Sequence, residues 1–292
     1  MRPRLWIGLS LLLALMAPAF GGDTKAPFKA TPFEGRKGKS DRVVVMELFT
    51  GAQCPPCVAA DMAFDVLAET YKTSDLVQLQ YHMHIPGPDP MTNPDTIARW
   101  DYYRKAFPAQ MRGVPSSLFN GKPAAGGGGG AAAAEKKYLA YREVIDPLLE
   151  EAAVAKIVAS ATRKGDKIEV KAEVSGLANP GADKRLRLVL VEKSIKYTGG
   201  NKLPVHHQVV RALLGGPNGF ALEAKDSKHT ATVDLMELRQ GLNRYLDEFA
   251  AKRAFPNKNR PLDFNALRVV AFVQNDDNQE ILQGVQVDVN DR

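Results

Sequence analysis

The chain has 292 residues, with 39 basic and 33 acidic side chains and a formal net charge of +6 at pH 7. The basic residues are spread along the sequence and form no aromatic-studded basic stripe, so a nucleic-acid partner is not expected. Only two cysteines are present, which excludes a scaffold held together by several disulfides. The length is sufficient for two hydrophobic cores.

The first residues have the composition of a secretory signal peptide. Two arginines precede an apolar run from Leu5 to Ala17, and an Ala-Pro-Ala sequence ends at Ala19. An uncleaved membrane anchor is the alternative, but this run is short for a transmembrane helix. We therefore expect residues 1–19 to be removed, leaving a periplasmic or secreted protein without stable membrane insertion.

The next segments alternate between strand and helix patterns. Residues 20–41 are rich in proline, glycine and lysine without an apolar period, and we expect a flexible linker there. The β-branched apolar run at 43–49 predicts a strand buried on both faces. Helical spacing over 54–72 and alternation over 76–84 predict a helix and a second strand.

Three further elements complete this half of the chain. Residues 95–107 predict a helix with Asp95 as its N-cap, and 114–122 predict a strand entering an Asn-Gly turn. The tract 124–134 consists of glycine and alanine, so we expect a flexible insertion. It lacks the Lys-Ser or Lys-Thr of a phosphate-binding loop. Residues 135–153 predict another helix.

After residue 153 the sequence changes to short alternating apolar runs. Seven such runs, separated by turn clusters such as Asn-Pro-Gly at 179–181, predict an immunoglobulin-like β-sandwich over 154–292. One helix, at 236–255, interrupts them. The expected fold is therefore an α/β domain over 42–153 followed by an all-β sandwich domain.

Both cysteines lie at the first strand-to-helix junction, in the sequence Cys54-Pro-Pro-Cys57. A cross-link over so short a loop adds little stability, so the pair points to chemistry. A zinc site needs more ligands at matching spacing, and no other cysteine exists. A helix N-terminus stabilises a thiolate, which predicts Cys54 as the accessible attacking thiol and Cys57 as the resolving thiol.

The sequence ELFTGAQCPPC and the downstream Gly-Val-Pro ending at Pro115 resemble the thioredoxin superfamily. The resemblance covers residues 42–153 and is closer to secreted thioredoxin-like proteins with a C-terminal β-domain. It implies a thioredoxin-like fold and a redox-active Cys54–Cys57 disulfide that needs no other cofactor. It also implies a cis bond between Val114 and Pro115, next to the cysteines.

Many members of this family carry a buried acid six residues before the first cysteine, where this sequence has Leu48. Glu47 stands one residue earlier and could lie beneath the site. A half-buried carboxylate there could accept the proton of Cys57. The alternative is an exposed glutamate at a strand end.

His82 and His84 end the second predicted strand and share one face by its period of two. Together with Cys54 and Cys57 they could form a copper site, because copper accepts thiolate and imidazole ligands. The alternative is that both histidines are hydrogen-bonded polar residues without a metal.

These patterns together predict an exported thiol–disulfide oxidoreductase. Its partners would be client proteins with thiols or disulfides and a redox partner protein. The expected catalytic residues are Cys54, Cys57, Pro115 and Glu47. A copper metallochaperone and a redox-inert binding protein are the alternatives.

Overall fold

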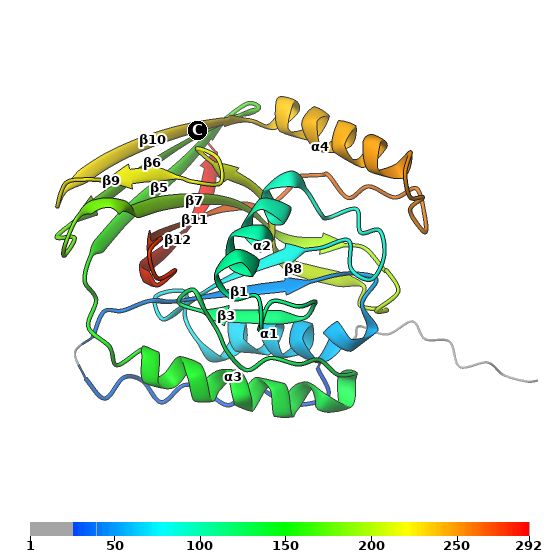
Figure 1. Cartoon of the computed structure of the whole chain (residues 1–292), viewed down its shortest axis with the longest axis horizontal. Coiled ribbons are helices and arrows are strands. Elements are labelled where there is room, and N and C mark those ends of the chain that lie inside the picture. The colour runs from blue at the N-terminus through cyan, green and yellow to red at the C-terminus, as the bar shows by residue number, and fades with distance from the viewer. Residues whose placement is uncertain (1–25, 39, 292) are drawn as a thin grey trace, which may run out of the picture.

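The computed structural model describes residues 26–38 and 40–291, and this part of the chain contains twelve strands and four α-helices (Figure 1). The predicted signal peptide and the start of the predicted linker lie outside the described residues. None of the described helices has the length and apolar character needed to cross a membrane.

The first half of the chain alternates between strands and helices, as predicted. Its elements are β1 (Val44–Thr50), η1 (Pro55–Cys57), α1 (Val58–Thr70), β2 (Leu76–His82), α2 (Pro94–Ala106), β3 (Ser116–Phe119), β4 (Lys122–Pro123), η2 (Ala131–Ala133) and α3 (Ala134–Leu148). Strand β1 is parallel to β2 and antiparallel to β3, which in turn pairs with β4.

Strand β1 is buried on both faces, which confirms the prediction from its continuous apolar run. Met46 and Leu48 point into a core shared with α1 and α3, whereas Val45 and Phe49 point into a second core shared with α2. Helices therefore cover both faces of this part of the sheet (Figure 1).

The second half consists mainly of strands, with one helix. Its elements are β5 (Lys156–Lys164), β6 (Lys167–Ser175), β7 (Gly181–Lys196), β8 (Val205–Leu214), β9 (Phe220–Leu222), β10 (Ser227–Asp234), α4 (Leu235–Ala250), β11 (Leu267–Asn275) and β12 (Ile281–Asp291). This half therefore consists of strands interrupted by one helix, as predicted.

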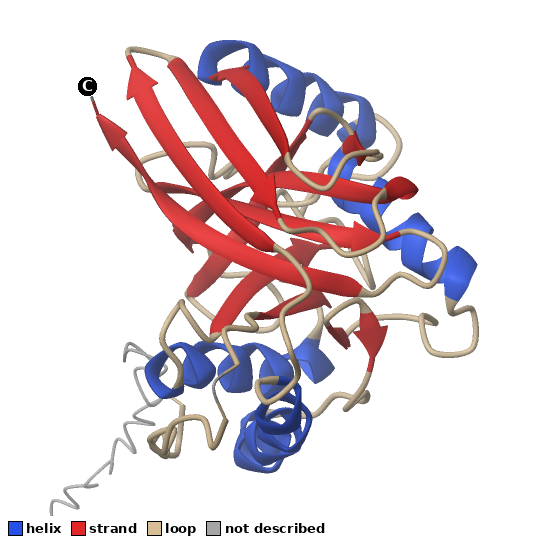
Figure 2. Cartoon of the chain, turned by 90° about the vertical axis from the view of Figure 1, so that its left-hand side faces the viewer, coloured by secondary structure: helices blue, strands red, loops and turns tan. Residues whose placement is uncertain are grey.

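The strands of the two halves are hydrogen-bonded to each other, which the sequence did not predict. Their order is β10-β6-β5-β12-β11-β7-β8-β2-β1-β3-β4, with β9 on β7, so one twisted set of strands runs through both halves (Figure 2). The junction is a parallel contact between β2 and β8 at Gln80 and Val209. The resulting architecture is a mixed α/β fold dominated by one sheet.

Strand β7 shows why the halves are joined. Leu188 and Leu190 face a core that also contains residues of β5, β6 and α4, whereas Val189 and Val191 face the core around α2. Because both faces of β7 are apolar, each face must be covered by other parts of the chain. The second half thus completes a core that begins in the first half.

The described part of the predicted linker is attached to the surface, so the expectation of a flexible linker is wrong for these residues. The Phe28 ring lies 5.3 Å from that of Tyr138, and the Phe33 ring lies 5.0 Å from that of Tyr71. Two aromatic side chains in a polar segment gain enough by burial to hold it in place.

Helix α2 begins one residue earlier than predicted, with Asn93 rather than Asp95 as its N-cap. Asn93 and Thr96 form a reciprocal capping box. The Asp95 carboxylate instead accepts a hydrogen bond of 2.7 Å from the backbone N–H of Leu213. Asp95, the predicted N-cap, therefore contacts the second half of the chain instead of capping the helix.

Candidate functional site

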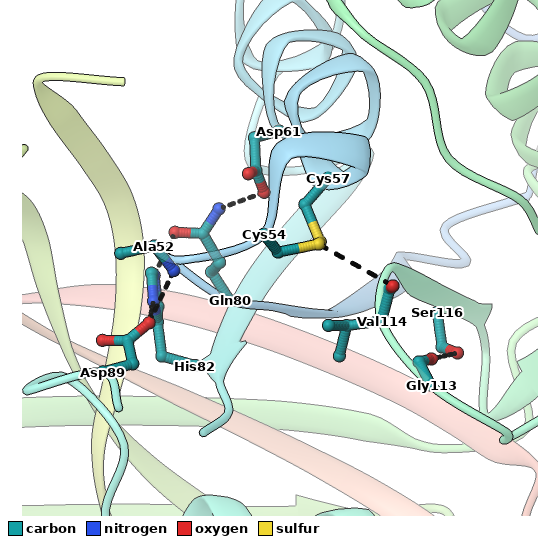
Figure 3. Close-up of a disulfide and its surroundings, with 10 residues drawn as sticks. All are labelled: Ala52, Cys54, Cys57, Asp61, Gln80, His82, Asp89, Gly113, Val114 and Ser116. Atoms are coloured by element: carbon teal, nitrogen blue, oxygen red, sulfur yellow. Dashed lines mark hydrogen bonds and ion pairs between the residues drawn. A yellow bond between two sulfur atoms is a disulfide. The ribbon is translucent and has the colours of Figure 1, made fainter. Parts of the chain in front are cut away.

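Cys54 and Cys57 form a disulfide at the junction between β1 and α1, with their Cα atoms 5.3 Å apart (Figure 3). The two prolines occupy the first positions of the η1 turn, where backbone N–H groups would have no partner within the helix. The backbone N–H of Cys57 donates to the carbonyl of Cys54 at 3.0 Å. The pair therefore lies where the sequence predicted it.

Neither cysteine is accessible, contrary to the prediction for Cys54. Its exposed fraction is 1%, and that of Cys57 is 0%. Three loops from other parts of the chain surround the turn that carries them. Sequence spacing could not show this, because each loop approaches from a distant position.

The first loop carries Val114 and Pro115, whose peptide bond is cis, as predicted. The carbonyl oxygen of Val114 lies 3.8 Å from the Sγ atom of Cys54 (Figure 3). The hydroxyl of Ser116 donates to the Gly113 carbonyl at 2.6 Å and closes the loop on itself. Pro115 therefore belongs to the site.

The second loop is the glycine and alanine tract, which we expected to be a flexible insertion. It is packed against the cysteine turn, so that expectation is wrong. The backbone N–H of Gly129 donates to the Pro56 carbonyl at 2.6 Å, and that of Ala59 donates to the Gly129 carbonyl at 2.9 Å. Because glycine has no side chain, its backbone can approach another backbone this closely.

The third loop connects β7 and β8 in the second half of the chain. The backbone N–H of Asn201 donates to the Ala52 carbonyl at 2.9 Å, and that of Gly200 donates to the Gln53 side-chain oxygen at 3.0 Å. A Cβ atom on Gly199 would lie 2.3 Å from the Ala52 carbonyl oxygen. The second half thus holds the residues that immediately precede Cys54.

Glu47 is buried, and its carboxylate is hydrogen-bonded to groups other than the cysteines. Its carboxylate accepts two hydrogen bonds from Arg99, at 2.8 and 2.9 Å, and another from the Tyr103 hydroxyl. Arg99 also donates to the Gln274 side chain at 2.8 Å. Its partners place Glu47 in the core around α2, where it joins β1 to α2 and β11.

Asp61 is the buried acid that the sequence analysis missed. It lies one helical turn after Cys57, on the same face of the helix, and helical side chains lean toward the N-terminus. Its exposed fraction is 3%, and burial raises the pKa of its carboxyl well above the usual range. One carboxylate oxygen, Oδ2, has no hydrogen-bond partner among the described residues. The place of Asp61 one helical turn after Cys57 was the signal available in the sequence.

A chain of buried polar groups extends from Asp61 around the base of the site (Figure 3). Gln80 donates to Asp61 at 3.2 Å and lies 3.0 Å from Nε2 of His82. The other ring nitrogen of His82 lies 2.8 Å from Asp89, which accepts a 2.6 Å hydrogen bond from the Ala52 N–H. The polar chain ends two residues before Cys54.

Both histidines are hydrogen-bonded to protein groups, and each of them contacts Asp89. His82 lies between Gln80 and Asp89, whereas His84 contacts the Tyr245 hydroxyl at 3.0 Å. Among residues 26–38 and 40–291, no group of three or more His, Cys, Asp or Glu side chains is arranged to hold a metal ion.

Partial burial of the His84 imidazole predicts that the stability of the protein depends on pH. Burial lowers the pKa of its imidazole from 6.5 to about 4, and the neutral ring accepts a 3.0 Å hydrogen bond from the Asp89 N–H. Because the folded pKa is the lower one, His84 loses its stabilising contribution as pH falls from 6.5 to about 4. In His84→Gln, urea unfolding should show a weaker loss of stability over this interval. Identical pH dependence in both proteins would contradict the prediction.

No protein-family profile matches the sequence, and no curated protein matches it. Among solved structures, HBP35 of Porphyromonas gingivalis matches with a TM-score of 0.57 and 18% identity, over 87% of this chain and 77% of that one. A structural-genomics protein of Agrobacterium tumefaciens matches with a TM-score of 0.49 and 16% identity, over 85% of this chain and 95% of that one. The first of these likenesses shows the fold alone, across both halves.

Proposed function

We propose that this protein is a thiol–disulfide oxidoreductase that acts on client proteins through Cys54 and Cys57. The observation that carries the proposal is the disulfide between them, at a strand-to-helix junction beside the loop of Val114 and Pro115. Two cysteines at such a junction can exchange electrons with a dithiol or disulfide without another cofactor.

We assign residues 42–153 to the thioredoxin-like class. The element order β1-α1-β2-α2-β3-β4-α3 and the position of the cysteines support this assignment. For the second half we propose a modified immunoglobulin-like sandwich. Strands β5 and β6 enclose a common core with β7 and β11, and β12 links the two sets by pairing with both β11 and β5.

The proposed reaction has two exchange steps. The Cys54 thiolate attacks a client disulfide, forms a mixed disulfide and displaces one client thiolate. Cys57 then loses its proton and attacks the Cys54 sulfur, which closes the Cys54–Cys57 bond and releases the second client thiolate. Two electrons pass from the pair to the client, and the client thiolates take up two protons. A redox partner protein with a dithiol then reduces the Cys54–Cys57 disulfide and is itself oxidised to a disulfide. The reverse steps oxidise a client dithiol, and a redox partner protein with a disulfide then reoxidises the pair.

We assign to Asp61 the role that the sequence suggested for Glu47. A buried carboxyl with a raised pKa is suited to accept a proton from a neighbouring thiol and return it in the reverse reaction. Its Oδ2 atom is not hydrogen-bonded to another described group, whereas Glu47 is occupied by Arg99 and Tyr103. This difference favours Asp61 as the group that exchanges a proton.

We further propose that the protein works after export, in the periplasm or as a secreted protein. The signal-like sequence at residues 1–19 supports this location, as does the presence of a disulfide, which persists in oxidising compartments. Its partners would be proteins that present a thiol or a disulfide, with no role for nucleic acid or stable membrane insertion.

The order of attack gives a direct test. Reduced Cys57→Ser should accumulate a mixed disulfide with an oxidised peptide, because it can attack but cannot resolve. Reduced Cys54→Ser should accumulate little, and the variant lacking both cysteines sets the baseline. Mass spectrometry under non-reducing conditions distinguishes these species. Equal accumulation by both single variants would contradict the assignment of Cys54, and no accumulation by either would count against the proposed function.

A further inference from the structure

Residues 124–130, which we call the glycine strap, lie directly over the turn that carries the disulfide. Gly129 makes one backbone hydrogen bond to the Pro56 carbonyl and one to the Ala59 N–H. The Ala59 N–H belongs to the first turn of α1, where backbone donors have no partner within the helix. The glycine strap therefore caps the helix that begins at the cysteines.

The closest approach is at Gly128. A Cβ atom added there would lie 2.3 Å from the Pro56 carbonyl oxygen and 3.0 Å from Cδ of Pro115. The strap thus reaches from the cysteine turn to the proline loop. At Gly126, in contrast, an added Cβ atom would meet nothing within 4 Å. Only part of the strap depends on having no side chain.

The glycine strap is anchored at its start and held less firmly along its five glycines. The Ser117 hydroxyl donates to the carbonyls of Ala124 and Ala125, at 2.7 and 3.3 Å, and both alanines pack against the core of α1 and α3. From α3, the Lys137 ammonium donates to the carbonyls of Ala125 and Gly126, at 2.9 and 2.6 Å. Backbone segments held by few contacts open locally at low free energy, and glycine favours the open state because it gains more conformational freedom than other residues. The five glycines can therefore leave their position without unfolding the cores.

A pocket of about 380 Å³ remains between the glycine strap and the proline loop, and its lining includes Pro56, Val114 and Pro115. Nevertheless, the exposed fraction of Cys54 is only 1%. Exchange requires a sulfur of the client to reach a cysteine sulfur, and its rate depends on access. In the closed arrangement a client sulfur has no such access.

We propose that the glycine strap is a gate that must move away from Pro56 and Ala59 before a thiol can reach the disulfide. The role of the gate toward client proteins rests on the proposed function. Its control over the access of any thiol to the Cys54–Cys57 disulfide does not. When the strap leaves, the Pro56 carbonyl and the Ala59 N–H become free. An extended client segment could form the same two hydrogen bonds, so the gate favours unfolded or extended clients over folded surfaces.

The test measures how fast dithiothreitol reduces the disulfide in the full-length protein, with free thiols titrated over time. In Gly128→Ala the new methyl group cannot fit against Pro56, so reduction should be about 10-fold faster than in wild type. Gly126→Ala is the matched control and should react like wild type. Unchanged or slower reduction in Gly128→Ala, with its melting temperature preserved, would overturn the gate.

Lys137→Met provides a second route that leaves the strap sequence intact. Loss of its two hydrogen bonds should also accelerate reduction, by several-fold, because they hold the strap to α3. If Gly128→Ala does not fold, Lys137→Met tests the gate by itself. Reduction of Lys137→Met at the wild-type rate would overturn the proposal. These rates involve no client. Accelerated reduction in a protein that forms no mixed disulfide with peptides would uphold the gate and reject the proposed function.

Discussion

Asp61→Asn is expected to slow the closure of the Cys54–Cys57 bond by about 100-fold, because general base catalysis by a positioned side chain contributes at least this much. Ellman's reagent separates the two steps. Attack by reduced Cys54 releases one thionitrobenzoate, and closure by Cys57 releases a second. The variant should retain the first phase and slow the second. Asparagine keeps the side-chain oxygen that accepts from Gln80, so local packing should survive.

The same substitution should make the protein more stable at neutral pH. Burial raises the folded pKa of Asp61, so the wild type loses stability as pH rises from the unfolded pKa toward the folded one. An asparagine side chain cannot ionise, so the variant should not show this loss. The difference in unfolding free energy between the two proteins should vanish in acid, where the wild-type carboxyl is protonated in both states.

Glu69→Gln is the matched control for this experiment. Glu69 lies on the same helix, but it is exposed, two turns further along than Asp61. It should leave both thionitrobenzoate phases unchanged. If Asp61→Asn closed its disulfide at the wild-type rate, or if Glu69→Gln were equally slow, Asp61 would not be the proton acceptor.

Arg99→Met is expected to lower the free energy of unfolding by about 3–5 kcal/mol, the usual effect of removing one partner from a buried ion pair. Arg99 is 2% exposed and Glu47 is 0% exposed, so the substitution leaves a carboxylate without its counter-charge in an apolar core. Denaturant unfolding measures the loss. Of its hydrogen bonds to side chains in the described part of the protein, the Glu47 carboxylate would keep the one from Tyr103.

Two comparisons make this prediction specific. Arg104→Met removes an exposed partner of Asp101 and should change stability by less than about 1 kcal/mol. The double variant Glu47→Leu/Arg99→Met should recover much of the lost stability, because no unpaired charge remains. A loss below about 1 kcal/mol in Arg99→Met would show that the pair does not hold β1 to α2.

The sequence by itself determined the local elements and the position of the cysteines. The apolar run of β1 requires burial on both faces, the alternating runs after residue 153 require strands, and the Pro-Pro pair suits the first turn of a helix. These properties depend on neighbouring residues alone.

Only the tertiary structure decided what surrounds the cysteines. The pairing of β2 with β8, the contact of Asn201 with Ala52 and the close approach of Gly128 to Pro56 all join residues far apart in sequence. The roles of the two acids were decided in the same way. Glu47 lies closer to the expected position, but Arg99 from α2 neutralises it, whereas the charged groups that act on the pKa of Asp61 are themselves acidic. Periodicity shows which residues are buried, and only long-range packing shows which partner each one has.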